Sequence, residues 1–192
     1  MALNKGLNGL VPARMRGSGA NSGGTTRYRI ANAFASNIFS GDVVKLGSTG
    51  TVAVITTTTD HVLGTFQGCE YVDPVSKQPI FGKYWPASTS SVDGTPYAIV
   101  NDDPASTYII QADATVTLAD VGINYTVTLG AGSTLTGRSG FGLKVAGRAT
   151  ASAMLQVIGL SNVPDNAFGD ANPKVEVRLV QHVDSYTSAA QS

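Results

Sequence analysis

Side chains that commonly carry out acid–base chemistry or bind metals are few in this sequence. It holds two histidines, His61 and His182, and one cysteine, Cys69. A structural zinc site usually takes four Cys or His ligands, one more than the chain possesses. Asp60-His61 and His182-x-Asp184 are close acid–histidine pairs, but no nucleophile motif accompanies them. We therefore expect no catalytic residue, no metal and no cofactor, and interpret both histidines as ordinary strand-end or surface residues.

The motifs that build active sites on turns are incomplete. The segment closest to a nucleophile elbow, G-x-S-x-G, is Gly137 to Phe141, which has Phe in place of the last Gly. Gly82-Lys83 lacks the upstream Gly and the following Ser or Thr of a phosphate-binding loop. Asn101 to Pro104 (NDDP) is typical of a turn, because Asn and Asp bond their own backbone. These segments indicate turns between strands.

The composition favours an all-β fold. Hydrophobic residues make up 42% of the chain, whereas charged residues make up only 14%, against a usual share of roughly 25%. The chain holds 20 Thr and 22 Gly; Thr favours strands and Gly favours tight turns. We predict a small β-barrel or sandwich of about ten short strands with an extended N-terminal arm.

Hydrophobic alternation and turn residues place these strands. Ser48 to Gly50 separates two short apolar runs and predicts a hairpin. Ile30 to Phe39 has the length of a helix, but its two Asn and its β-branched residues argue against one. The predicted strands are 41–47, 51–56, 61–71, 80–85, 97–100, 108–112, 115–118, 126–129, 141–145, 153–158 and 175–182.

The two ends of the chain differ from its middle. We predict a basic arm over residues 1–26, a β-barrel or sandwich body over 27–186 and a polar tail over 187–192. The chain has no acidic residue before Asp42. The lone cysteine cannot form an internal disulfide, and we see no signal peptide and no apolar run long enough for a membrane helix. We expect a protein made in a cytoplasm, with no membrane partner.

The basic residues near the N-terminus are candidates for binding a partner. Arg suits bidentate pairing with carboxylates. A Gly- and Ser-rich segment becomes ordered only where a partner offsets its entropy, so we expect the arm to lie on another chain, the alternative being a solvated tail. The absence of an aromatic residue before Tyr28 argues against a single-stranded nucleic-acid partner. The candidate contacts are Lys5, Arg14, Arg16, Arg27 and Arg29.

Several segments in a fixed order resemble one known family. The chain from about Gly41 to His182 resembles the head decoration (cement) proteins of tailed bacteriophages, and we see no match for the arm. The segments that carry the resemblance are Tyr97 to Pro104 (YAIVNDDP), Tyr108 to Asp113 (YIIQAD), Asp120 to Asn124, Thr136 to Ser139, Leu155 to Leu160, Pro164 to Asn166, Gly169 and Val177 to His182.

The resemblance implies a structural role in a virion. Such proteins resemble small β-barrels that sit on the outer surface of an icosahedral head, often as trimers, and bridge neighbouring major capsid subunits. We therefore expect two partners, the major capsid protein and further copies of this chain in a homotrimer. Tyr84 and Trp85 are candidate oligomer contacts. The alternative for Trp85 is core packing.

Two other classes of function remain open at this stage. A carbohydrate-binding adhesin or tail-associated module would use exposed aromatic residues, and Phe81, Tyr84 and Trp85 form the one cluster of these. A hydrolase would depend on His61 or His182. We expect the chain not to be an enzyme.

Overall fold

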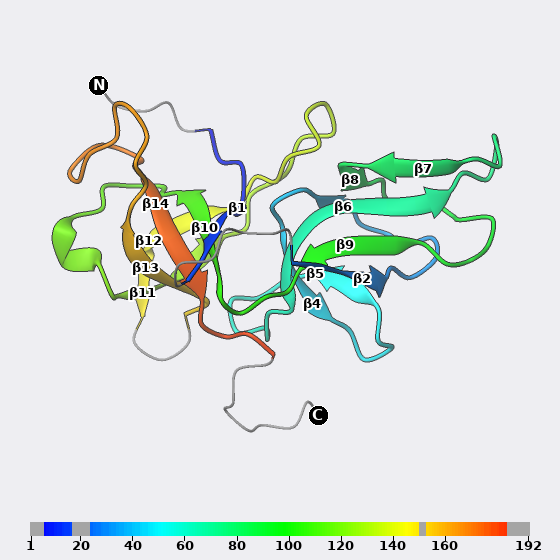
Figure 1. The fold of residues 1–192 in the computed structure, drawn as a ribbon, viewed down its shortest axis with the longest axis horizontal. Helices are drawn as coiled ribbons and strands as arrows, with labels where there is room; N and C mark the ends of the chain where they lie inside the picture. The colour runs from blue at the N-terminus through cyan, green and yellow to red at the C-terminus, as the bar shows by residue number, and fades with distance from the viewer. Residues whose placement is uncertain (1–5, 17–23, 150–152, 184–192) are drawn as a thin grey trace.

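The computed structural model describes residues 6–16, 24–149 and 153–183. These residues form an all-β protein built on two six-stranded antiparallel arrangements that lie side by side (Figure 1). The first sheet has the order β1 (Val11–Met15), β10 (Ser106–Gln111), β14 (Lys174–Leu179), β13 (Leu155–Leu160), β11 (Asn124–Thr128) and β12 (Gly142–Ala149). The prediction of an all-β fold is confirmed.

The second sheet comes from the middle of the chain. Its order is β2 (Thr25–Arg29), β9 (Tyr97–Asn101), β6 (Gly64–Val72), β4 (Val43–Leu46) and β5 (Val52–Val54), with β7 (Pro79–Gly82) paired to the far half of β6. A separate ribbon joins β3 (Ile38–Phe39) to β8 (Tyr84–Trp85). The second sheet is therefore an insertion between β1 and β10 of the first.

Both sheets curl, because strands far apart in the sheet order meet again at a single bridge. In the first sheet Ala112, just after β10, bridges to Leu143 of β12. In the second sheet Ile30, just after β2, bridges to Val52 of β5. One bridge is not a continuous ladder, so neither sheet is a closed barrel. Each curl instead wraps its sheet around its own group of apolar side chains.

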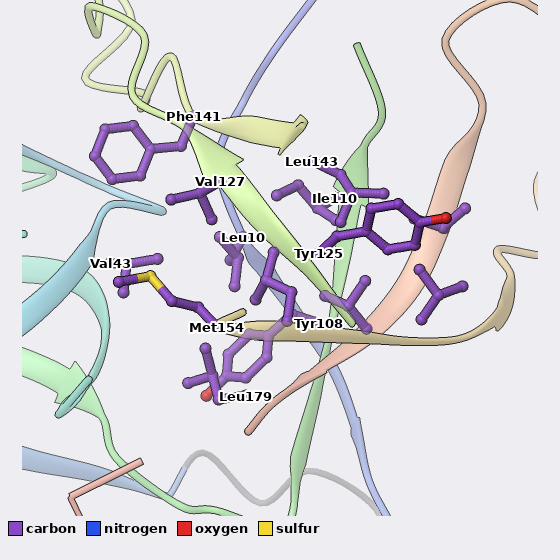
Figure 2. Close-up of a cluster of buried hydrophobic side chains, with 14 of the residues drawn as sticks. Leu10, Val43, Tyr108, Ile110, Tyr125, Val127, Phe141, Leu143, Met154 and Leu179 are labelled. Carbon is purple, nitrogen blue, oxygen red and sulfur yellow. The ribbon is translucent and has the colours of Figure 1, made fainter. Parts of the chain in front are cut away.

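The first core fills the curl of the first sheet. Its side chains alternate inward along the strands, as Tyr108 and Ile110 do on β10. Figure 2 shows Val43 of β4 among these side chains, beside Met154 and the residues of the first sheet. Because Val43 is attached to the second sheet, the first core also joins the two sheets.

The second core is smaller and is centred on Phe66 and Trp85. Ile30 and Ile38, which lie in the segment that resembles a helix in length, also belong to it. That segment contains turns and the short strand β3 and no helix, which confirms the argument against one.

The N-terminal segment is part of the body, which corrects the predicted domain boundary. Leu10 is fully buried in the first core, β1 pairs with β10 from Val11 to Met15, and β2 begins at Thr25. The prediction of a separate arm over residues 1–26 is therefore wrong for residues 6–16. The partner that orders this segment is the chain's own sheet edge. Residues 1–5 and 17–23, and the predicted tail at 187–192, lie outside the described residues.

The strand predicted over residues 115–118 does not form. Residues 115–117 are irregular, and Leu118 begins a 3-10 helix that ends at Asp120. The carboxylate of Asp120 accepts hydrogen bonds from the backbone N–H (2.8 Å) and the hydroxyl (2.9 Å) of Thr117. The T-x-x-D spacing is a capping signal, which here overrides the alternating pattern.

Candidate protein-binding surface

The arginines predicted to reach a partner are placed at the edges of the two sheets. Arg14 on β1 donates to both carboxylate oxygens of Glu176, from Nε at 2.7 Å and Nη2 at 3.0 Å. Arg27 on β2 likewise pairs with Glu70 on β6. Arg16 and Arg29 form no ion pair with any described residue. Lys5 lies outside the described residues.

These ion pairs change what Arg14 and Arg27 can contribute. Each carboxylate belongs to this chain, so each pair stabilises the attachment of an N-terminal edge strand to its own sheet. The hydrogen bond from Arg14 lowers the pKa of Glu176 from its ordinary value and raises that of Arg14 itself. A partner's carboxylate would therefore have to compete with an intramolecular one.

Trp85 belongs to the interior. It is 0% exposed in the second core, and its ring meets Tyr71 edge-on at a centroid distance of 5.3 Å. The prediction of Trp85 as an oligomer contact is therefore corrected to core packing, the alternative weighed from the sequence. Tyr84 is half-buried and stacks on Phe39 at 5.5 Å. Strand alternation explains the difference, because successive side chains of β8 point to opposite faces.

The side chains that could act in acid–base chemistry lie among contacts that stabilise the fold. Asp60 pairs with Lys45 at 2.9 Å and accepts from the backbone N–H groups of Thr56 and Thr57. These contacts lower its pKa to about 2, against the opposing effect of burial. Burial raises the pKa of the Cys69 thiol to about 11, so it stays protonated at neutral pH. His61 is exposed, whereas His182 is buried.

Within the described residues no group of three His, Cys, Asp or Glu side chains could hold a metal ion. Of the Asp pair in the NDDP turn, only Asp103 bonds the local backbone as the sequence suggested. Asp102 accepts from Thr26 and Tyr28, and Asp103 accepts from the backbone of Ala105. No helix in the described part of the chain is long and apolar enough to cross a membrane.

Two projections present large apolar side chains to solvent. The β6–β7 hairpin extends at the right of Figure 1 and carries Val75 at its turn (88% exposed) and Phe81 on β7 (69% exposed). The yellow-green loop between β11 and β12 rises between the two sheets and carries Leu135, which is 94% exposed. Sequence reasoning noted Phe81 in an aromatic cluster but missed Val75 and Leu135.

Glycines fix the base of the β11–β12 loop. A Cβ on Gly130 would lie 2.1 Å from the carbonyl oxygen of Gly140, and one on Gly140 would lie 2.1 Å from that of Ala131. At the tip, Ser133 donates to the carbonyl of Arg138 at 2.9 Å, and Gly137 donates to that of Ser133 at 2.8 Å. Backbone hydrogen bonds therefore order the loop, and Leu135 projects from it into solvent. In the sequence, a single Leu between two Thr in a Gly-rich segment could have predicted this exposed side chain.

Asp42 is the buried acid nearest to this loop. Burial raises its pKa to about 6, although hydrogen bonds from Ser139 and the backbone N–H of Phe39 act in the opposite direction. It borders a cleft of about 570 Å³ that Phe39, Phe141 and the loop from Gly130 to Leu135 also line. The carboxylate thus ties β4 to the base of the loop.

Comparison with known proteins gives no relative for this chain: no family model, no curated protein and no solved structure matches it.

Proposed function

We propose that this protein is a capsid decoration, or cement, protein that binds the outer surface of an icosahedral phage head and bridges major capsid subunits. The observation that carries the proposal is the set of exposed apolar side chains, Val75, Phe81 and Leu135, on two bonded projections. Apolar and aromatic side chains held on a rigid scaffold are typical anchors of protein–protein interfaces. The order of segments that resembles the decoration family supports the same assignment.

The edge formed by β1 favours contact through side chains over the addition of a strand. Pro12 lies in β1, and the pairing of β1 with β10 shifts register between Pro12 and Arg14. A proline and a bulge on an edge strand both hinder pairing with another chain. Strand addition at β1 is thus disfavoured, and the projections are the better candidates for contact.

Repetition on a lattice explains how a few anchors suffice. Each Phe or Leu anchor contributes modestly to the binding free energy. In the proposed homotrimer, however, binding of one copy to the capsid lattice raises the effective concentration of the other copies at the neighbouring capsid sites. The proposed mechanism is mechanical: the protein joins neighbouring capsid subunits and resists their separation. It requires no cofactor.

The test is co-sedimentation of the purified protein with phage heads that lack it. The double variant Phe81→Ser with Leu135→Ser should bind at least about tenfold more weakly, since each anchor contributes roughly 1–2 kcal/mol. Leu118→Ser is the matched control, because Leu118 is 71% exposed on the 3-10 helix and lies outside both projections. Unchanged binding of the double variant, or binding of the protein to glycans and tails instead of heads, would contradict the proposal.

A further inference from the structure

A groove runs from the junction of the two sheets onto the outer face of the first. One hollow of about 110 Å³ lies between β1 and the second sheet, and a second of about 220 Å³ lies over β10 and β14. Asn8, Val11 and Arg138 line both hollows, so the two are adjacent. Both are smaller than the roughly 300–1,000 Å³ of typical small-molecule sites, which suits the side chains of an extended segment.

Three basic side chains from distant parts of the chain meet this groove, which we call the basic groove. Lys83, between β7 and β8, and Arg138, in the β11–β12 loop, line the first hollow. Arg138 and Lys174 of β14 line the second. Within the part of the chain that the structure describes, no acidic residue lines either hollow and no ion pair engages these three side chains.

The fold holds these cations close together. Gly137 adopts a φ of +69°, and a Cβ there would lie 2.9 Å from the Cβ of Lys83, so the loop packs directly against the Lys83 stem. Lys174 is fixed by its backbone, which donates to and accepts from the side chain of Asn166. Grouped like charges repel one another unless an anion is bound between them. The groove is therefore complementary to negative charge.

The remaining lining shows which kind of anion fits. Val11 lies at the middle of the groove and is 44% exposed, with Ile109 and Val163 beside it in the second hollow. Asn8 and Gln67 add amide groups that suit a peptide backbone. Among the described residues that line the hollows, none is an aromatic side chain that could stack on a nucleic-acid base. We infer that the basic groove binds an extended protein segment in which acidic residues flank an apolar one.

This inference rests on the proposed function for its partner, a surface segment of the major capsid protein, but its chemistry can be tested alone. The probe is a fluorescein-labelled peptide with a Glu-Leu-Glu centre, compared with its Gln-Leu-Gln counterpart and with an oligothymidylate. Fluorescence anisotropy at low and high salt measures each affinity. The Glu peptide should bind at least about tenfold more tightly than the other two, and salt should weaken it.

Charge reversal locates the binding. Lys83→Glu with Arg138→Glu should weaken the Glu peptide at least about tenfold. The matched control, Lys77→Glu with Lys144→Glu, reverses two exposed lysines outside the groove and should leave the affinity unchanged. Circular dichroism checks that both variants fold. Equal binding of the Gln peptide, tighter binding of the oligothymidylate, no binding up to about 1 mM, or an equal loss in the control would overturn the inference.

The same reversal variant separates this inference from the proposed function. If it still binds phage heads as tightly as the unaltered protein, the basic groove is not the contact, while the decoration role stands. If the unaltered protein binds the Glu peptide but no heads, the groove stands and the decoration role fails.

Discussion

Arg14 and Glu176, which are 162 residues apart in sequence, form a bidentate pair in which Nε and Nη2 of the arginine donate to Oε1 and Oε2 at 2.7 and 3.0 Å. The two residues lie on β1 and β14, the strands on either side of β10. Their pair spans β10 and fastens the N-terminal edge strand to a strand near the C-terminus. The second sheet is inserted in the sequence between β1 and β10, and the pair helps to hold these two strands in one sheet.

Replacing Arg14 by Ala should destabilise the protein at neutral pH but not in acid. The pKa of Glu176 is lowered in the folded protein, so its stabilising contribution is present above its unfolded value of 4.5 and is lost as pH falls through the folded value. The free energies of unfolding by urea of Arg14→Ala and the unaltered protein should differ at neutral pH and converge in acid, below the folded pKa of Glu176. Glu176→Gln should reproduce this pattern, and a difference that persists in acid would refute the explanation.

Replacing Asp42 by Asn should remove a loss of stability that occurs as pH rises. Its folded pKa of about 6 exceeds the ordinary value of 3.8, so the folded state binds the proton more tightly. The associated stability is complete below about pH 4 and is lost as pH rises through about 6, by up to about 3 kcal/mol. The opposite contribution of Asp60, whose pKa is about 2, lies below this window.

The measurement is urea unfolding at a series of pH values from about 4 to about 7. The free-energy difference between Asp42→Asn and the unaltered protein should change across this range in favour of the variant. If the difference in unfolding free energy is the same at every pH, burial does not raise the pKa of Asp42 in the folded protein.

Replacing Met154 by Ala should lower the stability of both sheets together. Met154 is fully buried in the first core with Val43 of the second sheet (Figure 2), and a large-to-small change there costs about 2–5 kcal/mol. Trp85 is the only tryptophan and lies in the second core. The unfolding midpoint measured by Trp85 fluorescence should therefore move to lower urea concentration together with the midpoint measured by circular dichroism.

Met15→Ala is the matched control, because Met15 is only half-buried on the edge strand β1, and it should cost markedly less. A Trp85 transition that stays in place when Met154 is truncated would mean that the two sheets unfold independently.

Replacing Gly132 by Ala should displace Phe39. A Cβ at Gly132 would lie 2.2 Å from Cδ2 of the Phe39 ring, which stacks on Tyr84. Overpacking of this kind costs about 1–3 kcal/mol, and the near-ultraviolet circular dichroism of the aromatic residues should change. Gly159→Ala is the control, because a Cβ there meets nothing within 4 Å. Equal stability of the two variants would contradict the close approach of the loop to Phe39.

Local signals in the sequence account for most of the strands. The hairpin of β4 and β5 follows from two apolar runs around a Gly, and Gly50 indeed has a φ of +71°. The alternation in residues 175–182 likewise predicts β14. In contrast, β1 and the first two residues of β2 fall in the predicted arm, and neither strand is predicted, because their basic and polar residues lack the pattern of a buried strand. Edge strands need less apolar surface, and their pairing depends on residues far along the chain.

The candidate protein-binding surface depends even more than the strands on contacts between residues far apart in the sequence. The sequence shows five basic residues near the N-terminus, but it does not show that Arg14 and Arg27 meet Glu176 and Glu70 of the same chain. Nor does it show that Lys83, Arg138 and Lys174 line two adjacent hollows. Such groupings join residues that are far apart in the sequence and come together only when the two sheets fold, so no short stretch of sequence predicts them.

The most direct test of the proposed role compares phage heads with and without this protein, first by electron cryo-microscopy and then under heating or osmotic shock. The decoration role predicts density for the chain on the outer head lattice, with Phe81 and Leu135 at capsid contacts, and release of DNA at lower stress from heads that lack it. Density confined to the tail, or equal resistance of the two kinds of head, would contradict it.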